Sequence, residues 1–178
     1  MKEDIQEILI TEEQLKEKIK ELGTAISEDY KGKDLVLIGI LKGSVIFMGD
    51  LMKEIYIHCS MDFMAVSSYG NATQSSGVVK ILKDLDFEIE GKYVIIVEDI
   101  IDSGITLSYL RKYLIARNPN SLEIVALLDK PTGRKVDISA KYMGFKVPDA
   151  FLVGFGLDYA ERYRNLPFIG ILKESVYK

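Results

Sequence analysis

The sequence is poor in the residues that crosslink a chain or anchor it in a membrane. Its 178 residues include one cysteine, Cys59, so an intrachain disulfide is impossible and a reducing compartment is favoured. Cys59 and the single histidine, His58, are too few to build a zinc site. No apolar run approaches the roughly 20 residues of a membrane-spanning helix, and the first ten residues lack a signal-peptide core. We therefore expect a cytoplasmic protein.

Several function classes are also disfavoured by what is missing. A net charge of −4 without a dense basic patch gives no reason to expect binding to nucleic acid or to an anionic membrane. Neither G-x-G-x-x-G nor a loop ending in G-K-[ST] occurs, which argues against dinucleotide and triphosphate-loop enzymes. No repeat, low-complexity tract or proline-rich linker divides the chain. The length fits a single domain over residues 1–178.

Apolar periodicity predicts alternating strands and helices. The predicted helices cover residues 11–30, 44–55 and 107–118, and the predicted strands cover residues 35–41, 59–68, 78–82, 93–97 and 123–128. Thr11 and Gln14 fit a capping box at the start of the first helix. The unbroken apolar composition of 35–41 and 93–97 is typical of strands covered on both faces. These patterns predict an α/β fold with a mainly parallel sheet flanked by helices.

The two ends of the chain carry a different pattern. Short strand-like segments occur in the tail, over 138–145, 150–156 and 168–172. We expect them to form a small lobe from about 1–10 and 137–178, beside a core of about 11–136.

The segment VEDIIDSGITL, residues 97–107, combines carboxylates with features of an anion site. Glu98 and Asp99 follow a predicted buried strand, and ligands of open α/β sheets bind at the carboxyl ends of strands. Gly104 and Thr106 lead into a helix, whose first N–H groups suit a phosphate. Carboxylates suit sugar hydroxyls or Mg²⁺. Asp102 could act as a base, or Asp102 or Ser103 could simply cap the helix.

This segment resembles the phosphoribosyl pyrophosphate signature of the type I phosphoribosyltransferases. Four further blocks resemble the 6-oxopurine (hypoxanthine-guanine) branch of that family in the same order: LKGS (41–44), SSYG (67–70), LLDKPTGR (127–134) and VPDAFLVGFGLDYAERYRNLP (147–167). The similarity covers roughly residues 8–172. It implies the type I phosphoribosyltransferase fold with a small hood lobe.

The resemblance also implies an activity and its partners. The reaction would transfer 5-phosphoribosyl from 5-phosphoribosyl 1-pyrophosphate to N9 of hypoxanthine or guanine, releasing pyrophosphate, with Mg²⁺ as cofactor. The family commonly forms homodimers and homotetramers. The alternative is a regulatory relative that binds nucleic acid, which a dense basic patch or an added DNA-binding domain would indicate. The sequence has neither feature.

By the same resemblance, the segment after residue 97 would hold the sugar phosphate. Glu98 and Asp99 would bind the ribose hydroxyls and, with Asp158, the metal. Asp102 would be the general base or proton relay at the purine N7. The other substrate-binding residues of the segment, the last four wrapping the 5′-phosphate, would be Ile100, Ser103, Gly104, Ile105 and Thr106.

Three further blocks would complete the site. Lys42 and Gly43 match a pyrophosphate-binding loop in which a non-proline cis peptide is usual, and Arg164 matches a residue that holds pyrophosphate. Ser68 and Tyr69 match the start of a lid, which we expect over 69–77. Taken alone, Lys42 is a solvated lysine in a glycine turn, and 158–164 is a solvated helical face with charge pairs.

The purine would be recognised by Lys130, Phe151 and Leu152. Lys130 would donate to O6, which selects a 6-oxopurine over adenine because the 6-amino group is itself a donor. Phe151 would stack on the ring, and Leu152 would contact the base through its backbone. The alternatives are a surface lysine before a proline turn and two core residues of a strand.

Overall fold

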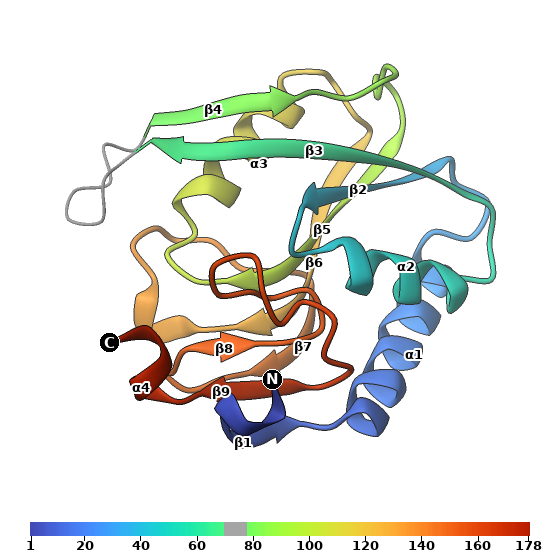
Figure 1. Ribbon diagram of the computed structural model, residues 1–178. Helices are drawn as coiled ribbons and strands as arrows, with labels where there is room; N and C mark the ends of the chain where they lie inside the picture. The colour runs from blue at the N-terminus through green and yellow to red at the C-terminus, as the bar shows by residue number, and fades with distance from the viewer. Residues whose placement is uncertain (70–77) are drawn as a thin grey trace.

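The computed structural model describes residues 1–69 and 78–178, which form a large sheet with helices on both faces and a small sheet beside it (Figure 1). The large sheet has the order β4-β3-β2-β5-β6-β7. Its strands are β2 (Leu35–Leu41), β3 (Cys59–Tyr69), β4 (Val78–Lys83), β5 (Tyr93–Ile101), β6 (Ser121–Asp129) and β7 (Tyr142–Lys146). Every pairing is parallel except β3 with β4. The predicted α/β fold is confirmed.

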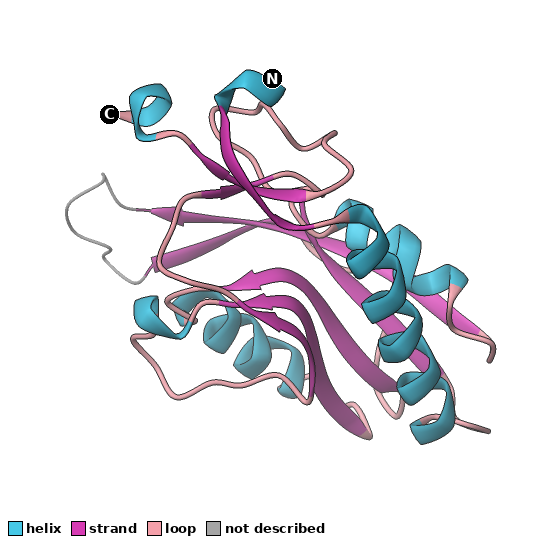
Figure 2. Cartoon of the chain, turned by 90° about the horizontal axis from the view of Figure 1, so that it is seen from below, coloured by secondary structure: helices cyan, strands magenta, loops and turns pink. Residues whose placement is uncertain are grey.

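Helices cover both faces of this sheet (Figure 2). The long helices are α1 (Glu12–Asp29), α2 (Val45–Lys53) and α3 (Ile105–Ile115), and the short ones are η1 (Lys2–Asp4), η2 (Pro131–Gly133) and α4 (Glu174–Tyr177). The capping box is confirmed, because Thr11 Oγ1 accepts from the Gln14 N–H at 3.3 Å and Gln14 Oε1 accepts from the Thr11 N–H at 2.8 Å. Within the described ranges, no helix is long and apolar enough to cross a membrane.

Alternate residues of β2 enter two different hydrophobic cores. Leu35 and Leu37 pack in the cluster that contains the apolar faces of α1 and α2. Val36 and Ile38 pack in the cluster that contains the apolar face of α3. All four side chains have no solvent exposure, as expected for a central parallel strand. This two-sided burial holds the carboxyl end of β2 rigidly beside that of β5.

The small sheet is built from both ends of the chain. It has the order β1-β9-β8, all antiparallel, with β1 at Ile5–Ile10, β8 at Leu152–Val153 and β9 at Ile169–Leu172. The lobe boundary that we expected near residue 137 needs correction, because β7 pairs in parallel with β6 and belongs to the large sheet. β7 joins the large sheet because the edge of β6 offers unpaired backbone groups, which the sequence pattern of β7 does not reveal.

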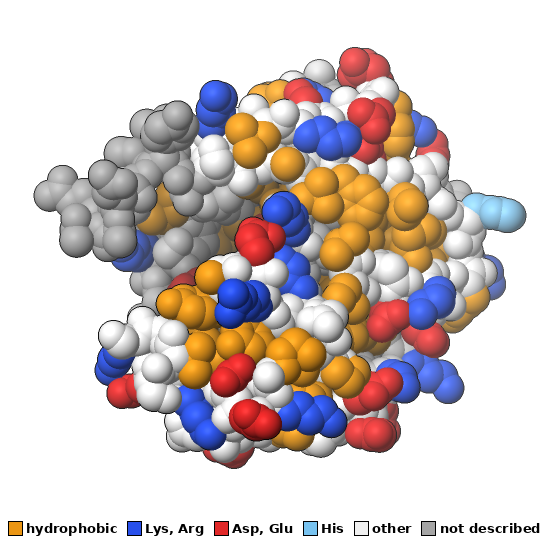
Figure 3. All heavy atoms as spheres, viewed as in Figure 1, with side chains coloured by type: hydrophobic (Ala, Val, Ile, Leu, Met, Phe, Trp, Pro, Cys, Tyr) orange, Lys and Arg blue, Asp and Glu red, His pale blue; other side chains and the backbone are white. Residues whose placement is uncertain are grey.

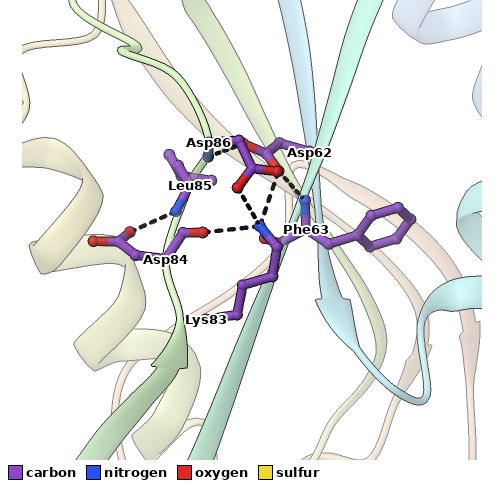
Figure 4. A network of polar contacts seen from close by, with 6 residues as sticks. All are labelled: Asp62, Phe63, Lys83, Asp84, Leu85 and Asp86. Atoms are coloured by element: carbon purple, nitrogen blue, oxygen red, sulfur yellow. Dashed lines mark hydrogen bonds and ion pairs between the residues drawn. The ribbon is translucent and has the colours of Figure 1, made fainter.

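A buried carboxylate ties the β3–β4 hairpin together at its base (Figure 4). Asp62 is 5% exposed and accepts hydrogen bonds from the N–H groups of Phe63 and Asp86, both at 2.7 Å. Lys83 Nζ lies 3.4 Å from Asp62 and 3.1 Å from Asp86. A buried carboxylate is tolerated when its acceptor sites are filled in this way. The network fixes the start of the hairpin, whose other end carries Ser68 and Tyr69.

Candidate active site

The turn between β5 and α3 carries the acidic segment. β5 runs to Ile101, beyond the predicted end at residue 97, because its pairing with β6 continues to that residue. Glu98 and Asp99 therefore lie within the last residues of the strand. Gly104 is the N-cap of α3, with φ of 77° and no side-chain cap. Neither Asp102 nor Ser103 is therefore the N-cap residue, but Ser103 Oγ accepts a hydrogen bond from the Ile105 N–H at 3.4 Å, so the capping interpretation holds in part for Ser103.

Glu98 and Asp99 are carboxyl groups removed from water. Glu98 is 8% exposed, and its burial raises its pKa well above the ordinary value, with a further increase from the charge of Asp99. Burial likewise raises the pKa of Asp99 to about 6. The Ile100 N–H, which donates to Asp99 Oδ1 at 2.8 Å, and the nearby Arg164 charge oppose that increase, and the charge of Asp158 adds to it. The pair is poised to favour a bound cation or a hydroxyl donor.

The raised pKa of Asp99 predicts an unusual pH dependence of stability. The folded state binds this proton more tightly than the unfolded chain, whose carboxyl titrates near 3.8. The free energy of unfolding of the metal-free protein should therefore fall as the pH rises from about 4 to about 6, by up to about 3 kcal/mol from Asp99. Asp99→Asn should remove this contribution. Urea unfolding at pH 4.5 and pH 7 with a chelator measures it, and an identical pH difference in variant and wild type would contradict it.

Glycine residues bring the ends of β2 and β5 into direct contact. The peptide bond between Leu41 and Lys42 is cis, as the resemblance implied for this loop. A Cβ placed on Gly43 would lie 1.7 Å from Asp99 Oδ2, and a Cβ on Gly156 would lie 2.0 Å from the Gly43 carbonyl oxygen. Only residues without side chains allow this approach. The structure thus brings together the predicted pyrophosphate loop, the acidic pair and the loop after β8.

The loop that contains residues 158–164 is not helical. Ala160, Glu161 and Tyr163 have positive φ values of 51°, 63° and 76°, and Tyr159 pairs with Arg162 in an isolated antiparallel bridge. The alternative of a solvated helical face is therefore wrong. The loop instead folds back toward the end of β2.

Arg164 organises this loop. Its Nη2 lies 2.9 Å from Asp158 Oδ1 and 3.4 Å from Glu161 Oε1, and its Nη1 donates to the Gly156 carbonyl at 2.7 Å. Its buried Nε has no hydrogen-bond partner within the described part of the chain. Lys42 Nζ lies 3.0 Å from Glu161 Oε2, which links the loop to the end of β2. Glu161 therefore joins the two cationic side chains, Lys42 and Arg164, next to the predicted pyrophosphate loop.

The predicted metal ligands do not form a complete cage. Across residues 1–69 and 78–178, no group of three or more His, Cys, Asp or Glu side chains lies close enough to hold one ion, so Asp158 does not converge with Glu98 and Asp99. Asp158 is paired with Arg164 instead. Mg²⁺ usually takes one or two carboxylates and fills its other positions with water and substrate phosphates. The adjacent buried acids at 98 and 99 fit that mode.

Lys130 lies at the end of β6, next to the acidic turn. Its N–H donates to the Ile101 carbonyl at 3.0 Å, and its Nζ lies 2.9 Å from Asp149 Oδ1. The side chain of Lys130 is 17% exposed, whereas that of Asp149 is 70% exposed. Lys130 is thus neither a free surface lysine nor fully buried, and Asp149 orients its ammonium group.

Phe151 and Leu152 differ in environment. Phe151 is 37% exposed, stacks on Tyr177 with ring centroids 4.8 Å apart, and meets Tyr159 edge-on at 5.5 Å. Leu152 is 7% exposed and packs in the core beside α1, so the core interpretation holds for its side chain. Phe151 offers an accessible aromatic surface, whereas Leu152 can contribute only through its backbone.

The predicted lid begins at the far end of the β3–β4 hairpin. Ser68 and Tyr69 are the last residues of β3, and their backbones pair with Val79 and Val78 of β4. The lid predicted over 69–77 lies outside the described residues except for Tyr69.

Sequence reasoning assigned no role to several residues that shape the site. Glu161 joins Lys42 to Arg164, Asp149 holds Lys130, and Gly156 admits the backbone of Gly43. All lie in blocks that carried the family resemblance, yet their contacts join segments far apart in sequence, such as positions 42 and 161. The only sequence signal for any of these residues is the recurrence of glycine in FLVGFG, which includes Gly156.

Comparison with known proteins agrees with this geometry. The phosphoribosyl transferase domain family matches residues 6–160. A hypoxanthine-guanine phosphoribosyltransferase from Bacillus subtilis is 58% identical over 100% of this chain and 99% of its own length, and one from Staphylococcus aureus is 56% identical over 99% of both. A crystal structure of a hypoxanthine phosphoribosyltransferase from Staphylococcus aureus superposes with a TM-score of 0.98, at 56% identity, covering 100% of this chain and 97% of that one. The chain belongs to the hypoxanthine-guanine phosphoribosyltransferase family.

Proposed function

We propose that this protein transfers 5-phosphoribosyl from 5-phosphoribosyl 1-pyrophosphate to N9 of hypoxanthine or guanine, giving IMP or GMP and pyrophosphate. The observation that carries the proposal is the meeting of three parallel strand ends. The Lys42–Gly43 loop after β2, the acids of β5 and Lys130 after β6 adjoin one another through the contacts of Gly43 with Asp99 and of Lys130 with Ile101. The sugar diphosphate and the purine, bound together, would touch all three.

The sugar phosphate lies, in this proposal, along the β5–α3 turn. Glu98 and Asp99 accept hydrogen bonds from the ribose hydroxyls, which relieves the cost of burying both carboxylates. The first turn of α3, with Thr106 and the backbone of Ile105, supplies N–H and O–H donors to the 5′-phosphate. Holding the sugar at both ends fixes C1 between the diphosphate and the purine, which is catalysis by orientation.

The diphosphate faces the cationic side of the site. Lys42 and Arg164 stabilise the negative charge that grows as the C1–O bond breaks. Mg²⁺ would be held by Glu98 and Asp99, and when bound it supplies positive charge to the departing diphosphate. Glu161, which now pairs with Lys42 and Arg164, must give up these partners to the ligand.

The purine occupies the side of Lys130 and Phe151. Lys130 Nζ donates to O6, the Phe151 ring stacks on the base, and the backbone of Leu152 contacts its edge. Asp102 takes the proton at N7 while N9 attacks C1. Asp102 is exposed, so its carboxylate can pass the proton on to water.

The proposal is tested by measuring nucleotide formation from each purine in a spectrophotometric assay, with and without Mg²⁺. We expect turnover with hypoxanthine and guanine, none with adenine, and loss of rate when the metal is chelated. Failure to form nucleotide from any purine would overturn the proposal, and binding of nucleic acid in its place would support the regulatory alternative.

Lys130→Ala should separate the base from the sugar diphosphate. We expect the KM for hypoxanthine to rise roughly 10- to 100-fold, since a charged donor to O6 is lost, while the KM for 5-phosphoribosyl 1-pyrophosphate changes little. Lys146→Ala removes an exposed lysine from neighbouring β7 and serves as the control. An equal rise in KM for both substrates would show that Lys130 does not recognise the purine specifically.

The partners and location form the last part of the proposal. Hydrophobic side chains gather over α2 and β3 (Figure 3). Among the exposed apolar residues of these elements, Val45 of α2 is 43% exposed and Met61 of β3 is 50% exposed. Such a surface suits a protein–protein contact. We propose a cytoplasmic homodimer or homotetramer, which light scattering on the purified protein would measure.

A further inference from the structure

The segment after β6, residues 130–138, folds back along the β5–α3 turn. It donates hydrogen bonds to three consecutive carbonyl groups, the first at the end of β5 and the next two in the turn. The pairs are Lys130 N to Ile101 O at 3.0 Å, Arg134 Nε to Asp102 O at 3.0 Å, and Lys135 N to Ser103 O at 2.9 Å. The central contact is the only one of the three made by a side chain.

Arg134 is itself fixed from several directions. Its Nη2 pairs with Asp129 Oδ1 and lies 3.4 Å from the Ile101 carbonyl, and its Nη1 donates to the Ile138 carbonyl. The side chain is 21% exposed. Only the planar, five-donor guanidinium can serve partners in these directions at once, and a lysine ammonium cannot.

The orientation of the three carbonyls determines where the turn directs its N–H groups. The peptide bonds of the turn are trans, and in a planar trans peptide the C=O and the following N–H point in opposite directions. The N–H groups of Asp102, Ser103 and Gly104 are therefore directed away from segment 130–138. Consecutive N–H groups directed to one side make an anion-binding surface.

Two glycines let the turn pack closely against this segment. A Cβ on Gly104 would lie 2.6 Å from Ile138 Cγ2, and a Cβ on Gly133 would lie 1.8 Å from Asp102 Oδ1. Both glycines are thus in contact across the same boundary. The Asp102 carboxylate rests on the face of Gly133, one residue before Arg134.

We propose that Arg134 is a positioning residue for phosphate recognition: it holds the Asp102 carbonyl so that the N–H groups of the β5–α3 turn face the 5′-phosphate. Arg134 touches no substrate atom and acts through the backbone of the turn. The inference rests on the proposed function, because it takes the ligand of this turn to be the 5′-phosphate of the nucleotide.

The test is the dissociation constant of IMP, measured by titration calorimetry on the intact protein for wild type, Arg134→Gln and Arg134→Lys. We expect both variants to bind IMP at least tenfold more weakly, because neither can hold the Asp102 and Ile138 carbonyls together. Arg134→Lys keeps the charge beside Asp129, so it should recover melting temperature relative to Arg134→Gln without recovering IMP affinity. The KM for hypoxanthine should change less than threefold.

Arg117→Gln is the matched control. Arg117 pairs with Asp84 at 2.5 Å, is 25% exposed and directs its side-chain hydrogen bonds to Asp84 and Tyr113, so its loss should lower the melting temperature and leave IMP affinity unchanged. If folded Arg134→Gln binds IMP with wild-type affinity, the inference about Arg134 is wrong and the proposed function is unaffected. If the wild-type protein binds no IMP, it is the proposed function that fails.

Discussion

The Asp102→Asn protein should transfer phosphoribosyl groups roughly 10²- to 10⁴-fold more slowly than wild type, because an amide cannot accept the proton from N7. The substitution keeps the shape of the side chain, which lies against Gly133. It also leaves the Asp102 carbonyl free to accept from Arg134 Nε. Asp102 is exposed, so the free energy of unfolding should change by no more than about 0.5 kcal/mol.

The rate should be measured under single-turnover conditions, because slow product release can hide a slower chemical step in kcat. Asp34→Asn provides the control. Asp34 immediately precedes β2, so it lies at the opposite end of the parallel strands from the candidate site, where it pairs with Lys92 at 2.7 Å. That variant should retain the wild-type rate. A single-turnover rate for Asp102→Asn within threefold of wild type would exclude Asp102 as the base.

The order of the elements was predictable because the sheet is buried on both faces. The apolar runs at 35–41 and 93–97 are typical of strands covered on both faces, and β2 indeed fills two cores with alternate side chains. β7 was misplaced because YMGFK is an edge strand with a mixed pattern. β7 pairs with the free edge of β6, and the local sequence pattern of β7 carries no information about that pairing.

Within the site, sequence identified the groups that are adjacent along the chain and missed those assembled from separate segments. Glu98 and Asp99 lie where expected, at the end of β5, and Asp102 directly follows the strand. The charge spacing of DYAERYR suits a helix equally well, yet three non-glycine residues there adopt positive φ. That conformation is imposed by the contacts of Arg164 and Lys42, which come from the folded structure.

Gly156→Ala should damage both stability and activity. Gly156 has φ of 101°, where an alanine is strained, and the new Cβ would lie 2.0 Å from the Gly43 carbonyl oxygen. Backbone strain and overpacking each cost of order 1–3 kcal/mol, so the free energy of unfolding should fall by about 2–6 kcal/mol. Urea unfolding and steady-state kinetics on the same preparations measure the two effects.

The loss of activity should exceed what the folded fraction explains, since relief of this clash must move Gly43. On its other side Gly43 has no free space, because even a Cβ there would lie 1.7 Å from Asp99 Oδ2. The displaced backbone therefore disturbs the pyrophosphate loop or the acid that binds the ribose, and the KM for 5-phosphoribosyl 1-pyrophosphate should rise. Gly49→Ala is the opposite case. Gly49 lies inside α2 with nothing within 4 Å of an added Cβ, so alanine should stabilise the protein by about 0.5–1 kcal/mol. If the two variants behaved alike, close backbone approach at Gly156 would not be what holds these loops together.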